Sequence, residues 1–108
     1  MALADSEKID FIGIAPDGYC VLTVADPDPW EDPAAHIEAL KAKLNTYMHF
    51  IRSGEIDRTY PDGQNTERKI LIALREAPPP AGVAFLQEAN ETITALGVAF
   101  SWQVFHAG

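Results

Sequence analysis

Four carboxylates fall within seven residues near the end of the first third of the chain, and a histidine follows them: Asp26, Asp28, Glu31, Asp32 and His36. Carboxylate oxygens together with an imidazole can hold a divalent cation. The candidate metal ligands are Asp28, Asp32 and His36. The spacing matches no calcium loop, because prolines interrupt the acids and no glycine turn is present. Acids also oppose the dipole at a helix N-terminus, which explains most of the cluster without a metal, and we expect no cofactor.

A nucleophile and a base could also be sought in Cys20, the one cysteine, with His36, His49 or His106. Apolar and β-branched neighbours surround Cys20, and this setting is typical of a cysteine buried in a strand. The chain contains no glycine-rich phosphate loop, Gly-x-Ser-x-Gly elbow or paired-cysteine motif. We therefore assign no catalytic residue and favour a non-catalytic role.

Trp30 is an aromatic residue among prolines and acids, directly before an expected helix. One interpretation is structural, with the ring packing on the first helical turn against Ile37. The other is that Trp30 contacts a partner within an acidic frame, as hot-spot aromatics do. On the second interpretation, the binding surface centres on Trp30 and extends to Tyr60 across a long connection. Its residues are Trp30, Asp26, Asp28, Asp32, His36 and Tyr60.

The elements that must position these residues can be read from local patterns. Apolar, β-branched segments predict strands at 8–15 and 19–25, joined by a Pro-Asp-Gly turn. Asp32 is suited to cap a helix that has Pro33 at its first position and stops at Ser53 and Gly54. Its apolar stripe comprises Ile37, Leu40, Leu44, Tyr47, Met48 and Ile51. A long polar connection (55–67), a strand (68–75), a second helix (81–96) and a last strand (98–106) complete the chain.

This order, β-β-α-β-α-β, predicts an α+β fold for residues 1–108 as a single domain, with residues 1–7 as a flexible tail. Two helices with one apolar stripe each would cover one face of a four-stranded mixed sheet, giving a two-layer α/β sandwich. The other face stays open. Because Phe105 lies on the opposite side of the last strand from Phe100 and Trp102, we expect a homodimer.

The net charge of −8 is concentrated in residues 1–32, which hold eight acids and one base. Such a field disfavours binding to nucleic acid and to an anionic membrane surface. The longest apolar runs are far too short to span a bilayer, and the acidic first residues do not fit a signal peptide. Together with the single cysteine, these features favour a cytoplasmic protein.

Several segments resemble a family of small bacterial proteins that is known only as a domain of unknown function. The similar segments include Ile9–Ile14, Leu22–Asp26, Lys43–Tyr47 and Phe50–Ile56, and the most specific part is Ser53-Gly54-Glu55 followed by Tyr60-Pro61. The resemblance implies a small bacterial protein and no particular activity. It draws attention to polar and aromatic positions that match the family pattern: Asp26, Trp30, His36, Asn45, Tyr47 and Tyr60.

These observations favour a protein-binding or regulatory module that acts through a protein partner. The alternative is a small metal-dependent enzyme or a small-molecule-binding protein that uses the segment from Asp26 to His36.

Overall fold

The structure, a computed structural model, describes residues 9–61 and 66–105. Its elements in chain order are β1 (Phe11–Ile14), β2 (Cys20–Asp26), α1 (Pro33–Arg52), α2 (Glu55–Thr59), β3 (Arg68–Leu74), α3 (Pro80–Ala95) and β4 (Ala99–Val104). The predicted order is confirmed, with the short helix α2 added. The tail predicted at residues 1–7 lies outside the described residues, as does His106.

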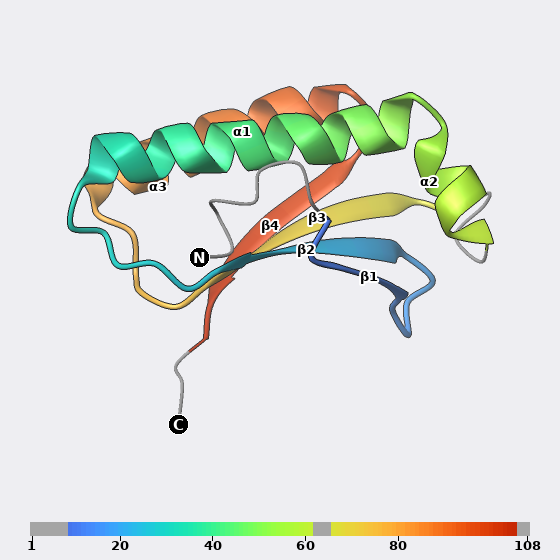
Figure 1. Cartoon of the computed structure of the whole chain (residues 1–108), viewed down its shortest axis with the longest axis horizontal. Helices are drawn as coiled ribbons and strands as arrows, with labels where there is room; N and C mark the ends of the chain where they lie inside the picture. The colour runs from blue at the N-terminus through green and yellow to red at the C-terminus, as the bar shows by residue number, and fades with distance from the viewer. Residues whose placement is uncertain (1–8, 62–65, 106–108) are drawn as a thin grey trace.

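The four strands form one mixed sheet in the order β1-β2-β3-β4. β1 and β2 pair antiparallel through the predicted turn, in which Gly18 adopts a φ of 91°. β2, β3 and β4 run parallel, so α1 and α3 each return the chain to the start of the next strand. Because such crossovers are right-handed and both proceed in the same direction, the two long helices cover the same face (Figure 1). The structure is therefore the predicted two-layer α+β fold.

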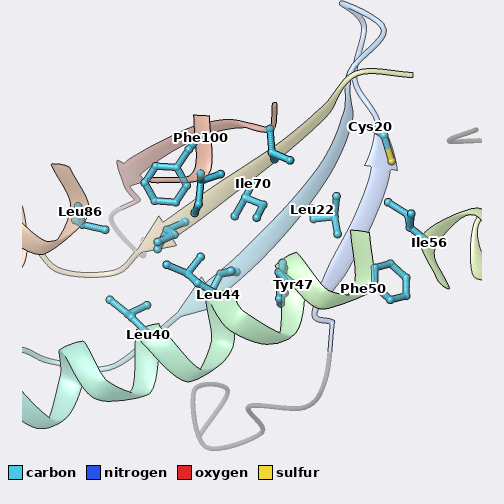
Figure 2. Packing of buried hydrophobic residues seen from close by; sticks show 14 of the residues in the cluster. Cys20, Leu22, Leu40, Leu44, Tyr47, Phe50, Ile56, Ile70, Leu86 and Phe100 are labelled. Atoms are coloured by element: carbon cyan, nitrogen blue, oxygen red, sulfur yellow. The ribbon is translucent and has the colours of Figure 1, made fainter. Parts of the chain in front are cut away.

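The core lies between the sheet and the two long helices (Figure 2). Alternate residues of β2 and β3 point into it, because successive side chains of a strand face opposite sides of the sheet. The helices contribute leucines from their inner faces. The fully buried side chains of this layer include Cys20, Leu22, Val24, Ile70, Ile72, Leu40 and Leu86.

The buried face of α1 differs from the predicted stripe. Ile37, Met48 and Ile51 are only half-buried, whereas His36 and Lys43 lie inside. Each of these two residues meets an acidic side chain: His36 lies 2.5 Å from Asp26 at the end of β2, and Lys43 lies 3.1 Å from Asp10, just before β1. A buried polar group costs little once it is paired in this way.

The long connection predicted at residues 55–67 is partly helical, which corrects the sequence prediction. Gly54 adopts a φ of 84° after the end of α1, and the chain turns into α2. Ile56 is fully buried and attaches this helix to the core. Asp57 in α2 also accepts a hydrogen bond of 2.6 Å from Arg68 at the start of β3.

The start of α1 depends on a side-chain cap that can be tested. The Asp32 carboxylate accepts a hydrogen bond of 3.2 Å from the amide of Ala35, one of the amides without a helical partner. We predict that Asp32→Ala lowers the free energy of unfolding by about 0.5–2 kcal/mol. Denaturant melts check this, with Glu31→Ala as the control that removes a neighbouring charge but no cap. Equal losses in both variants would contradict the prediction.

Candidate functional site

Asp26 and His36 form a buried pair at the carboxyl end of β2. Asp26 is the last residue of the strand, on its inward-facing side, and the first turn of α1 places His36 above it. Nε2 of His36 lies 2.5 Å from Oδ2 of Asp26, and the two side chains are 3% and 0% exposed. Oδ1 of Asp26 accepts a hydrogen bond from the amide of Asp28. Burial raises the pKa of Asp26, while the hydrogen bond with His36 opposes that effect.

Both ring nitrogens of His36 contact the protein itself. Nδ1 lies 3.1 Å from the carbonyl oxygen of Pro29, which can only accept, so Nδ1 is the donor. Nε2 then either donates to the Asp26 carboxylate or accepts from its protonated form, and the pair holds the same number of protons in both cases. His36 therefore has no ring nitrogen directed at a substrate or a metal.

Trp30 covers this pair from the loop between β2 and α1. Its ring stacks on His36 with centroids 3.6 Å apart and planes 2° from parallel. Its indole N–H donates to the carbonyl oxygen of Glu76, 3.3 Å away, in the loop between β3 and α3. The far edge of the ring approaches α3 so closely that a Cβ on Gly82 would lie 3.0 Å from two of its carbons. Trp30 thus joins both loops and both long helices.

The predicted binding residues separate into an inner and an outer set. Asp26 and His36 are buried, at 1% and 6% exposed, and cannot form a contact surface. Asp28 and Trp30 are half-buried, and Asp32 is exposed at the start of α1. The structure brings these five together at one end of the molecule. The predicted staple partner Ile37 is half-buried, and the ring that Trp30 stacks on is His36.

Tyr60 is not part of this group. It follows α2, which lies beyond the opposite end of α1 from the Trp30 loop (Figure 1). A helix of 20 residues is about 30 Å long, so the predicted extension of the surface to Tyr60 does not form. Tyr60 packs against the hydrophobic core instead.

The candidate ligands Asp28, Asp32 and His36 do not assemble a metal centre. Asp32 caps α1, and the nitrogens of His36 face Pro29 and Asp26. Across the part of the chain that the structure describes, no three histidine, cysteine, aspartate or glutamate side chains are grouped to hold a metal ion.

The structure contains a second buried polar network, which the sequence did not predict. Nζ of Lys43, fully buried on α1, lies 3.1 Å from Oδ1 of Asp10. Oδ2 of Asp10 accepts a hydrogen bond from the amide of Ala25. The backbone amide of Asp10 donates a hydrogen bond to the hydroxyl of Tyr47. That hydroxyl donates in turn to the carbonyl of Thr23, and burial raises the pKa of Tyr47. The network ties α1 to β2 and to the segment before β1. The sequence does carry a signal for this network, because His36, Lys43 and Tyr47 recur at helical spacing on the same face as the buried leucines of α1.

Cys20 is fully buried in β2, as its strand setting predicted, and burial raises the pKa of its thiol. A raised pKa disfavours the thiolate that a nucleophile requires.

The order of the strands in the sheet also bears on where a ligand could bind. Open α/β sheets bind ligands where the strand order reverses, whereas this order proceeds from β1 to β4 without reversal. At the carboxyl end of β2, Asp26 and His36 thus contact each other inside the protein, while Asp32 is exposed nearby.

Comparison with known families agrees with the resemblance seen in the sequence. A family model described as a family of unknown function, DUF6572, matches residues 1–106. The chain belongs to the DUF6572 family. No curated protein and no solved structure matches this DUF6572 member. Within residues 9–61 and 66–105, none of its helices combines the length and the apolarity needed to span a bilayer.

The close approach of Trp30 to α3 predicts an unusual response to Gly82→Ala. In an exposed helix this change stabilises by about 1 kcal/mol. In this DUF6572 chain the new Cβ would lie 3.0 Å from Trp30 ring carbons and from Cβ of Pro78. We predict a loss of about 1–3 kcal/mol from overpacking, measured by denaturant melts.

The same substitution in a Trp30→Phe background should cost less, since the smaller ring lacks the two carbons concerned. Ala84→Gly, at an exposed position of α3, reports helix propensity alone. A gain in stability from Gly82→Ala in the wild-type background would contradict the described packing.

Proposed function

We propose that this protein is a non-catalytic protein-binding module whose contact surface is the acidic end around Trp30. The observation that carries the proposal is that Trp30 is fixed by His36 and Glu76 yet remains half-exposed. An aromatic side chain held in place before binding loses little entropy when a partner covers it.

The charges around Trp30 support a partner with a basic surface. Glu31, Asp32 and Glu76 are exposed in the two loops, Asp28 is half-exposed, and Arg75 is the one base in residues 27–32 and 75–79. Attraction between these acids and a basic partner would accelerate association and make the association rate sensitive to salt. We propose the bacterial cytoplasm as the compartment, which the free, buried thiol of Cys20 supports.

Glu31→Lys tests this surface, because Glu31 is exposed and lies beside Trp30. The measurement is affinity capture of tagged protein from the native cell, with the retained proteins quantified for each variant. We predict that a specific partner is retained at low salt by the wild type and by the control Glu91→Lys, and is lost from Glu31→Lys. If every retained protein is unaffected by Glu31→Lys, the proposed surface is wrong.

We propose in addition that the open face of the sheet mediates a homodimer. Phe11 on β1 is 64% exposed and Phe105, after β4, is 49% exposed. The strand register places Lys69 and Gln103 on the same face, together with eight mainly small or apolar residues: Gly13, Val21, Thr23, Ala25, Leu71, Ala73, Ala99 and Ser101. Lys69 is the one charged residue at the strand positions of this face. Two acidic chains can therefore meet here without facing carboxylates.

Sedimentation velocity at high micromolar concentration tests the homodimer. We predict twice the chain mass of 11.8 kDa for the wild type, and dissociation for Phe11→Ser and Phe105→Ser. Leu96→Ser is the control, because Leu96 is 47% exposed but lies at the end of α3. A wild-type monomer, or a dimer that both phenylalanine variants leave intact, would refute the homodimer.

A further inference from the structure

A groove runs between α1 and α3 and opens to solvent. Leu44 and Ile93 are buried at its floor, while Met48, Phe85 and Ala89 are half-buried along its walls. Its volume is about 470 Å³. Leu96 is 47% exposed where the groove ends. The groove thus presents an apolar floor and walls that no other described element covers.

The shape of the groove follows from the fold. α1 and α3 run parallel to each other, because both return from the carboxyl ends of parallel strands. The lining residues lie between Lys41 and Arg52 on α1 and between Phe85 and Leu96 on α3. At 1.5 Å per residue each wall is about 16 Å long, the length of three helical turns.

The two rims of the groove carry different charges. Lys41 and Arg52 lie on the α1 rim, near its two ends, and both are exposed. Glu88 lies on the α3 rim. Asn45 and Thr92 complete the rims with neutral polar groups. A ligand that fills the groove therefore meets Arg52 and Lys41, which also pairs with Glu38 at 3.3 Å, on one side and Glu88 on the other.

We propose that this groove binds an amphipathic helix of a protein partner, about three turns long, with an acidic flank on α1 and a basic flank on α3. The apolar face of that helix would lie on the floor through side chains at i, i+3 or i+4, and i+7. Met48 suits the role because its flexible thioether adapts to different side chains. This inference rests on the proposed function as a binding module but concerns a surface separate from Trp30.

A synthetic helix of about 15 residues, with leucines on one face, glutamates on one flank and lysines on the other, is the probe. One control peptide replaces the leucines with serine, and another carries lysine on both flanks. The all-lysine peptide matters because the net charge of −8 by itself would favour it. Binding is measured by fluorescence anisotropy, and the site is mapped by amide shifts in nuclear magnetic resonance spectra.

We expect the mixed-charge peptide to bind one site per chain, more tightly than either control, with amide shifts concentrated in residues 41–52 and 85–96. Leu96→Glu and Arg52→Glu should each weaken binding about tenfold or more. Ala95→Glu and Arg58→Glu, matched exposed changes off the groove, should not.

The inference is overturned by tighter binding of the all-lysine peptide, by shifts on another face, or by equal losses in the groove variants and their controls. Occupation of the groove by decanoate in place of the peptide, or by a second copy of the chain, would also overturn it. Glu31→Lys should leave peptide binding unchanged. Failure at the groove is thus distinguishable from failure at the Trp30 surface.

Discussion

The contact between Asp26 and His36 is the interaction on which one end of the molecule depends. It joins the last residue of β2 to the first turn of α1, and Trp30 extends the connection to α3 by stacking on His36 and approaching Gly82. A buried carboxyl group and a buried imidazole are costly unless each satisfies the other. The two loops and both helix N-termini are therefore held in one arrangement.

Most of the fold was predictable, because its signals are local. Alternation in β2 and β3, the Asp32 cap and the turn at Gly18 each depend on residues adjacent in the chain. The short helix α2 was missed because five residues carry little periodic signal, and only the burial of Ile56 reveals its anchor. The open face of the sheet was predictable because two amphipathic helices can cover only one face of a four-stranded sheet.

The candidate site was predicted only in part, because burial of a charged residue depends on its partner. The apolar stripe predicted for α1 did not include Lys43, which is buried because Asp10, 33 residues earlier, pairs with it. The cluster from Asp26 to His36 was found as a unit, yet sequence spacing could not show that Asp26 and His36 face inward while Asp32 stays outside. Tyr60 was separated from the cluster by the length of α1, which a straight helix imposes. Asp26, His36 and Lys43 are therefore paired inside the fold, and the proposed sites of function are exposed surfaces.

His36 is fixed inside the protein by both of its ring nitrogens. Nitrogen-15 spectroscopy of the histidine rings at neutral pH tests it most directly, with the exposed His49 as an internal comparison. The structure predicts that Nδ1 of His36 carries a hydrogen, directed at Pro29, that exchanges with water far more slowly than the ring hydrogens of His49. An Nδ1 without a hydrogen, or exchange as fast as in His49, would contradict the account and make His36 available for chemistry.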